Sequence, residues 1–253
     1  FLVLYEVKQY IGFASQLPPT SRGASVPPLY LARKELLPVG PTPSGVDSGF
    51  CFRYVAGSMT ENTAKLILAS QSPRRLELLK QVTDQFEVVP SSVEEKLDYG
   101  LPPEENARAL ARTKAESVAE NYPHDWVIGA DTLVTLDHEI FEKPVDVPDA
   151  QRILRRLSGR EHFVITGICV VSPGKTLDKA VTSKVHFKPL SQEEISNYIE
   201  TGEPMDKAGA YAIQGKGSFM IREFSGSRSN IIGLPIDELK ILLKKTGFPA
   251  TPK

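Results

Sequence analysis

The spacing of apolar residues after residue 58 alternates between periods of about 2 and about 3.6, as expected for strands that alternate with helices. Apolar runs predict strands at 66–69, 86–89, 126–130, 162–171 and 181–187, the last two as a hairpin. Helical spacing and capping signals predict helices that start at Ser72, cover 103–121, include 150–157, start at Ser191 and lie between Pro235 and Gly247. The pattern therefore predicts one α/β or α+β domain at 59–253 with a sizeable core.

Residues 1–58 lack this periodicity and contain seven of the 20 prolines of the chain. Such a segment buries too little apolar surface to fold, so we predict a disordered leader. The chain begins with Phe1 and its first methionine is Met59, which favours upstream sequence translated from an early start. The alternative is a targeting peptide, but the segment has no clear amphipathic arginine helix.

Composition and charge narrow the classes of function. The chain has 30 Lys+Arg and 31 Asp+Glu, a formal net charge of −1, so it has no overall positive charge that would attract nucleic acid. No apolar run approaches the roughly 20 residues that a transmembrane helix needs, which excludes a membrane-spanning protein. Two cysteines make no disulfide framework and the four histidines lack zinc-site spacing, so a reducing, cytoplasmic location fits best.

The segment 66–75 leads from a strand into a helix that begins with Ser72, Pro73 and two arginines. Positive side chains at a helix N-terminus oppose the helix dipole, which costs roughly 0.3–1 kcal/mol. A bound anion would remove this cost, because backbone N–H groups and the guanidinium groups of Arg74 and Arg75 would converge on it. The alternative is a solvated surface helix, and this segment alone does not decide between the two.

Lys114 interrupts the apolar face of the predicted helix 103–121, seven residues after Ala107. A lysine in this position either extends past the edge of the core into solvent or points into a cleft that holds a carboxylate or a phosphate. Extension into solvent is the commoner arrangement, but the helix by itself leaves both open.

Asp131 and Thr132 follow the predicted strand 126–130, at the carboxyl end where α/β folds place ligand sites. Gly129 lets another backbone or a substrate approach closely. A carboxylate there can hold Mg²⁺ or take a proton from water, whereas an aspartate after a strand is also a common turn residue.

A glycine-rich connection at 202–217 links a predicted helix to the next strand. Long connections of this kind are either functional or flexible surface loops. In the functional case, Asp206, Lys207 and Gln214 are suited to contact a phosphate and a base.

At these positions the sequence resembles the Maf family of nucleoside triphosphate pyrophosphatases over about 64–245. The matching segments, in family order, are LILASQSPRR at 66–75, VIGADTLV at 127–134, EKP at 142–144, LSGR at 157–160, GEPMDKAGAYAIQG at 202–215 and IIGLP at 231–235. Each is unspecific alone, but the ordered set is specific. The resemblance implies a mixed α+β sheet with flanking helices, in a Maf/ITPase-like two-lobed domain with a central cleft, often as a homodimer.

The resemblance also implies roles for individual residues. Asp131 is the implied general base, and Glu95 and Asp131 together are the implied ligands of a divalent cation, Mg²⁺ or Mn²⁺. Lys114 and Lys143 are implied to bind phosphate and complete the catalytic set. The implied substrate-binding residues are Ser70, Ser72, Arg74, Arg75, Thr132, Asp206, Lys207 and Gln214. Arginine beside the Ser-Pro pair, threonine after the aspartate and glutamine in the IQG segment mark the branch that prefers dTTP and UTP over 7-methyl-GTP.

The function implied by this resemblance is hydrolysis of nucleoside triphosphates to nucleoside monophosphate and pyrophosphate, a house-cleaning role in the nucleotide pool. The implied substrates are dTTP, UTP and modified pyrimidine nucleotides, with no nucleic acid or membrane as partner. The alternative is a nucleotide-binding regulator of cell division, acting in septum formation, with weak or incidental hydrolysis. Release of pyrophosphate rather than orthophosphate separates a pyrophosphatase from a phosphatase, and turnover separates an enzyme from a regulator.

Overall fold

The chain divides into two units, Phe1–Asn62 and Thr63–Lys253. The computed structural model describes residues 33–36, 52–55 and 64–249. In the first unit, β1 (Arg33–Leu36) pairs antiparallel with β2 (Phe52–Val55). All other residues of the predicted disordered leader at 1–58 lie outside the described residues.

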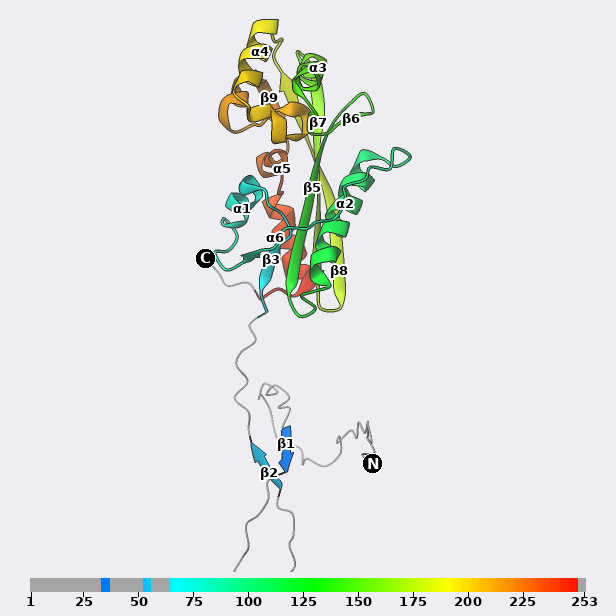
Figure 1. Cartoon of the computed structure of the whole chain (residues 1–253), viewed down its shortest axis with the longest axis vertical. Coiled ribbons are helices and arrows are strands. Elements are labelled where there is room, and N and C mark those ends of the chain that lie inside the picture. Colours follow the sequence, from blue (N-terminus) through cyan, green and yellow to red (C-terminus); the bar gives the residue numbers. More distant parts are fainter. Residues whose placement is uncertain (1–32, 37–51, 56–63, 250–253) are drawn as a thin grey trace, which may run out of the picture. The chain divides into compact units, whose positions relative to one another are not determined.

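Within the described part of the chain, the second unit holds a seven-stranded sheet with helices packed on it (Figure 1). The strands are β3 (Leu66–Leu68), β4 (Glu87–Val88), β5 (Trp126–Leu136), β6 (Glu139–Phe141), β7 (Glu161–Ser172), β8 (Lys175–Phe187) and β9 (Ile221–Ser225). The α-helices are α1 (Pro73–Leu79), α2 (Pro103–Ala119), α3 (Val147–Leu157), α4 (Gln192–Glu200), α5 (Arg228–Ile232) and α6 (Ile236–Thr246). Short 3₁₀ segments are η1 (Glu203–Asp206), η2 (Ala208–Ala210) and η3 (Gly215–Met220). The predicted mixed α/β class is confirmed.

The sheet is mixed, with strand order β4-β3-β5-β7-β8-β9 and with β6 added beside β5. β3 pairs in parallel with β4 and β5, and helices α1 and α2 provide the crossovers that parallel strands require. The remaining strands pair antiparallel, and β7 and β8 form the predicted hairpin. The sheet therefore changes from parallel to antiparallel pairing at β5.

Strand β5 is longer than the sequence pattern predicts. Instead of ending at Ala130, it continues through Asp131 to Leu136. The reason is tertiary, because β7 pairs antiparallel with this extension and places Gly167 opposite Asp131. The expectation that Asp131 follows the end of a strand is thus wrong, since the residue lies in the middle of one.

Helix α2 packs directly against the centre of the sheet, because two strand residues there lack a side chain. A Cβ at Gly129 would overlap the backbone oxygen of Ala111, and a Cβ at Gly167 would overlap that of Ala107. The prediction that Gly129 lets another backbone approach is confirmed, and that backbone belongs to α2. This contact sets the distance between α2 and the middle of β5.

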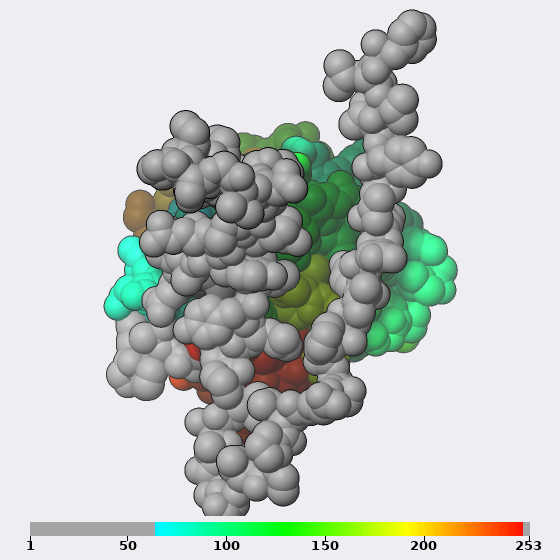
Figure 2. All heavy atoms as spheres, turned by 90° about the horizontal axis from the view of Figure 1, so that it is seen from below, coloured from blue at the N-terminus to red at the C-terminus, as the bar shows by residue number. Residues whose placement is uncertain are grey.

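The two faces of the sheet carry separate apolar clusters. The larger cluster includes Ile128, Leu154 and Leu239 and joins the sheet to α1, α3, α4 and α6, whereas the smaller includes Ala111 and Val127 under α2. Helices α2 and α6 therefore cover opposite faces. In the view from below, red atoms of the C-terminal part of the chain are visible (Figure 2). Among the described helices, none combines the length and apolar character that crossing a bilayer demands.

Candidate active site

One edge of β5 lacks a neighbouring strand for part of its length. Among the described strands, β3 pairs with β5 up to Ile128 and β6 pairs with it from Val134 onward. A cavity of about 640 Å³ opens at this gap. Because successive residues of a strand point to opposite faces, Asp131 and Thr132 reach the cavity from the two sides of the sheet. The break in strand pairing is therefore what gives a ligand access to both residues.

All of the residues predicted as site residues line this cavity. They are Ser70, Ser72, Arg74, Arg75, Glu95, Lys114, Asp131, Thr132, Lys143, Asp206, Lys207 and Gln214. They come from α1, α2, β5, and the connections that follow β3, β4, β6 and α4. The fold thus brings positive and negative side chains from separate stretches of the chain into one concave site.

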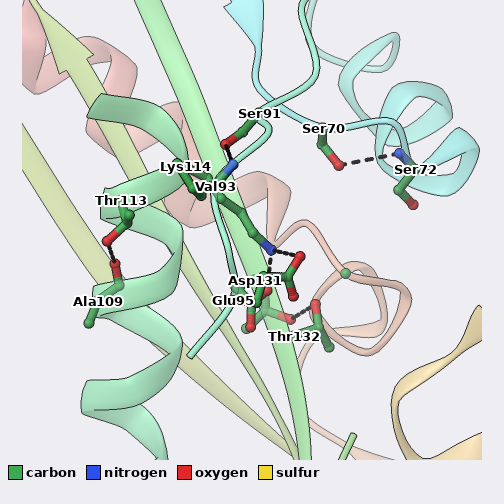
Figure 3. A network of polar contacts seen from close by, with 12 residues as sticks. Ser70, Ser72, Ser91, Val93, Glu95, Ala109, Thr113, Lys114, Asp131 and Thr132 are labelled. Carbon is green, nitrogen blue, oxygen red and sulfur yellow. Dashed lines mark hydrogen bonds and ion pairs between the residues drawn. The ribbon is translucent and has the colours of Figure 1, made fainter. Parts of the chain in front are cut away.

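Lys114 lies between two carboxylates inside the cavity (Figure 3). Its Nζ atom is 2.5 Å from Oδ1 of Asp131 and 2.9 Å from Oε1 of Glu95. The lysine and the aspartate are only 8% and 5% exposed. A buried ammonium group needs such partners, so Lys114 points into the cleft instead of extending past the core into solvent.

Glu95 connects this ion pair to the other positive groups of the site. Partial burial acts to raise the pKa of Glu95, but the hydrogen bond and charge of Lys114 outweigh this, helped by the charges of Lys143 and Arg75. The net pKa is lowered, so Glu95 is ionised at neutral pH. Its side chain is 46% exposed, which leaves the carboxylate accessible from the cavity.

Arg75 is fixed to the cavity wall by three different atoms of its guanidinium group. Nε donates to the carbonyl of Gly233 at 2.9 Å, Nη1 to Oγ of Ser70 at 3.2 Å and Nη2 to Oγ1 of Thr132 at 3.0 Å. Burial lowers the pKa of Arg75, partly offset by the charge of Asp131, yet an arginine stays protonated at neutral pH. The solvated surface helix is therefore not what the structure contains.

Arg74 and Lys207 both approach the carboxylate of Asp206. Nη1 of Arg74 is 3.5 Å from Oδ2, and Nζ of Lys207 is 2.5 Å from Oδ1. Burial acts to raise the pKa of Asp206, but the hydrogen bond and charge of Lys207, with the charge of Arg74, lower it overall. Two cations from different segments thus meet at the cavity wall.

The remaining predicted residues face the cavity with free side chains. Within the described part of the chain, Ser72, Lys143 and Gln214 make no side-chain hydrogen bond and no ion pair. Ser72 is the N-cap of α1 by backbone position, as predicted, although its hydroxyl does not cap the helix. These polar groups are available to a ligand.

The family model described as Maf-like protein matches residues 65–246 of this chain. The chain belongs to the Maf family. The "dTTP/UTP pyrophosphatase" of Koribacter versatilis is 47% identical over 182 residues, which cover 72% of this chain and 94% of that protein. The "dTTP/UTP pyrophosphatase" of Bacillus velezensis is 46% identical over 188 residues, which cover 74% of this chain and all of that protein. The Ham1 protein of Staphylococcus aureus is a solved structure similar over 72% of this chain and 98% of its own, with 15% identity and a TM-score of 0.44.

The glycine-rich connection of this Maf chain is held in place by Glu203. Its carboxylate accepts hydrogen bonds from the hydroxyl of Tyr198 and from the backbone N–H groups of Lys216 and Gly217, each at 3.0 Å. Burial acts to raise the pKa of Glu203, but the two backbone hydrogen bonds and the tyrosine lower it overall. The connection therefore has a specific conformation that places Gln214 at the cavity. Sequence reasoning missed Glu203, because a glutamate in a loop is usually solvated.

Other cavity residues of the Maf chain also went unpredicted. Ser91, Glu142 and Tyr211 line the cavity, and the hydroxyl of Tyr211 lies 2.8 Å from Nε2 of the buried His162. Glu142 belongs to the EKP segment, so its motif was a usable signal, but nothing in the sequence distinguishes Ser91 from other loop serines.

Glu95 and Asp131 are the carboxylates of this Maf site that are placed to hold a cation. Both already converge on one positive atom, Nζ of Lys114, so the geometry suits a shared positive partner. Among the described residues, no group of three or more His, Cys, Asp or Glu side chains gathers as a metal site. An ion here would need further oxygen ligands from water or substrate, which is the usual arrangement for Mg²⁺.

Proposed function

We propose that this Maf protein hydrolyses the bond between the α- and β-phosphates of dTTP and UTP, releasing a nucleoside monophosphate and pyrophosphate. The observation that carries the proposal is the position of Lys114 between Glu95 and Asp131, in a cavity that Arg74, Arg75 and Lys143 also line. The catalytic names of both relatives support the same reaction. Modified pyrimidine nucleotides belong to the proposed substrate range, which makes the role one of house-cleaning in the nucleotide pool.

The positive groups of the cavity suit a polyphosphate chain. The proposed phosphate-binding side chains are Arg74, Arg75, Lys114, Lys143 and Lys207. Because Arg74 and Lys207 share the exposed carboxylate of Asp206, phosphate oxygens can replace that partner without leaving either cation unpaired. Preorganised positive groups in a partly buried site stabilise the charge that develops on the departing phosphate, which is usually the largest catalytic contribution.

The apolar part of the cavity suits the base and sugar. Its lining includes the apolar residues Leu133, Val134, Ile213, Ile231 and Ile232. A ligand pocket typically combines such a surface with a few polar groups that set orientation. Gln214, with both a donor and an acceptor on its amide, and Thr132 are proposed to select the pyrimidine.

Asp131 is proposed to position and deprotonate the attacking water. The water oxygen forms a new bond to phosphorus, the bridging P–O bond breaks, and the proton of the water passes to the carboxylate of Asp131. Transfer of a proton to a positioned carboxylate contributes on the order of 10²–10⁴-fold. Lys114, 2.5 Å away, holds the carboxylate in place and offsets its repulsion of phosphate.

A divalent cation, Mg²⁺ or Mn²⁺, is part of the proposal, with Glu95 and Asp131 as its protein ligands. Two hard oxygen donors that converge on one point, one of them accessible from the cavity, fit such an ion. When bound, the ion would neutralise phosphate oxygens and order the polyphosphate. The lysines and arginines named above would act on the same oxygens.

Product analysis tests this function. The whole chain is incubated with Mg²⁺ and each of dTTP, UTP, CTP, ATP and GTP, and the products are separated by ion-exchange chromatography. Monophosphate with pyrophosphate, formed fastest from dTTP and UTP, is the expected result. Diphosphate with orthophosphate would contradict it, and binding without turnover would favour the nucleotide-binding regulator, a reading that neither relative's name supports.

The proposal also covers the cellular location and the oligomeric state of the enzyme. A cytoplasmic location is part of the proposal, and it rests on the presence of only two cysteines, Cys51 and Cys169, which make no disulfide framework. Burial raises the pKa of Cys169 to about 12, so the thiol is inert. A homodimer, which the family resemblance implies, is checked by analytical ultracentrifugation over a range of protein concentrations.

A further inference from the structure

Thr166 lies behind the cavity wall, on β7 directly opposite Thr132 of β5. Its side chain is completely buried and does not line the cavity. Its Oγ1 atom is 2.9 Å from the backbone oxygen of Asn230 and 3.0 Å from Oγ1 of Thr132. We propose that Thr166 is a positioning residue that orients Thr132 and, through it, Arg75 for nucleotide binding. This inference rests on the proposed function.

The direction of these hydrogen bonds follows from the groups involved. A threonine hydroxyl has one hydrogen and two lone pairs, and a carbonyl oxygen only accepts. Thr166 therefore gives its hydrogen to the carbonyl of Asn230, and the hydrogen between the two hydroxyls must come from Thr132. Thr132 then faces Arg75 with a lone pair, which is what the guanidinium group needs as an acceptor. The chain of donors runs in one direction, from Arg75 to Thr132 to Thr166.

Asn230 makes the end of this chain rigid. Its side chain is fully buried, and Nδ2 donates to the carbonyl of Val164 at 3.0 Å and to Oγ of Ser183 at 2.9 Å. The acceptor of Thr166 is thus tied to both β7 and β8, two of the longest strands in the described sheet. A hydroxyl bonded to such an anchor has one favoured orientation.

The same segment also holds Arg75 directly. Gly233, three residues after Asn230, accepts from Nε of Arg75, whereas Thr132 accepts from Nη2. Two acceptors from different segments restrict both the plane and the position of the guanidinium group, as buried outer partners do for the ligands of a metal. Thr166 supports only one acceptor of Arg75, and Gly233 and Ser70 still hold the guanidinium group at the cavity wall, so its loss should weaken binding more than chemistry.

The test combines two variants of Thr166, the Thr132→Val variant and one double variant with steady-state kinetics on UTP. In Thr166→Val, a replacement of similar shape that lacks the hydroxyl, KM is expected to rise by about threefold to tenfold, the size of one lost hydrogen bond, with kcat within about twofold. Thr166→Ser, which keeps the hydroxyl, should restore KM. In a Thr132→Val background, Thr166→Val should cause no further rise, because its effect passes through Thr132.

Thr135→Val is the matched control, since Thr135 is a buried threonine on β5 that does not line the cavity. It is expected to leave KM unchanged. A wild-type KM in Thr166→Val, or a rise of equal size in the Thr132→Val background, would overturn the positioning role. Absence of pyrophosphate release by the unmodified protein would instead refute the proposed function. In that case, calorimetry of UMP binding tests Thr166 separately. The dissociation constant of UMP should be higher for Thr166→Val than for the wild type, and an unchanged value would reject the inference.

Discussion

Lys114 of α2 and Asp131 of β5 form a buried ion pair, with 2.5 Å between Nζ and Oδ1. The pair exists because α2 lies against the bare backbone of Gly129 and Gly167. A side chain at either glycine would separate the helix from the strand. The catalytic pair that we propose therefore depends on residues that carry no functional group.

Replacing Asp131 by Asn should abolish pyrophosphate release from dTTP, with a loss on the order of 10²–10⁴-fold or more, because the amide does not accept the proton of water. The far-ultraviolet circular dichroism spectrum should stay that of the wild type. Asp137→Asn is the control, since Asp137 is an exposed turn residue that does not line the cavity. Near wild-type turnover by Asp131→Asn would remove Asp131 from its proposed role.

Gly167→Ala should destabilise the protein and reduce turnover together, because the new Cβ overlaps the backbone of α2 at Ala107. Overpacking of this kind typically costs about 1–3 kcal/mol or more, measurable by urea unfolding. Gly100→Ala is the matched control, since its Cβ would meet only the carboxylate end of Asp98, a surface side chain. Equal stability of the two variants would contradict the packing argument.

Glu203→Gln should raise KM for the nucleotide several-fold while changing kcat less, because an amide oxygen cannot replace both carboxylate oxygens that accept from the connection. Glu200→Gln, an exposed change at the end of α4, is expected to behave like the wild type. If Glu203→Gln bound nucleotide as tightly as the wild type, the connection would not depend on this carboxylate.

His162 should make stability fall in mild acid. Burial lowers its pKa from 6.5 to about 4, so the unfolded chain binds a proton at a higher pH than the folded protein does. The contribution of neutral, buried His162 to the free energy of unfolding is fully present above pH 6.5. It is lost as pH falls toward 4, by up to about 3 kcal/mol. Urea unfolding between pH 7 and pH 4.5 measures this loss.

His162→Gln should flatten that dependence, whereas His124→Gln, at an exposed position, should leave it as in the wild type. A wild-type slope in His162→Gln would assign the acid sensitivity to other groups.

Local sequence signals were enough for most elements of the fold. The capping box at Ser191 and the start of α1 after Ser72 appear in the structure as predicted, because caps and helical periodicity depend on neighbouring residues. The hairpin of β7 and β8 was likewise readable from its two apolar runs. The ordered motifs also indicated which residues line the cavity, since each predicted site residue is found there.

Only the tertiary structure decided the length of β5, the orientation of the Lys114 side chain and the hydrogen bonds that link Arg75 through Thr132 to Thr166. Asp131 lies within β5 because β7 pairs with it, and Lys114 turns inward because the carboxylates that neutralise it come from distant segments. Thr166 and Asn230 carry no local signal at all, because a buried hydrogen bond is defined by its partner across the fold. Short-range patterns report on conformation, whereas the proposed chemistry here depends on contacts between residues far apart in the chain.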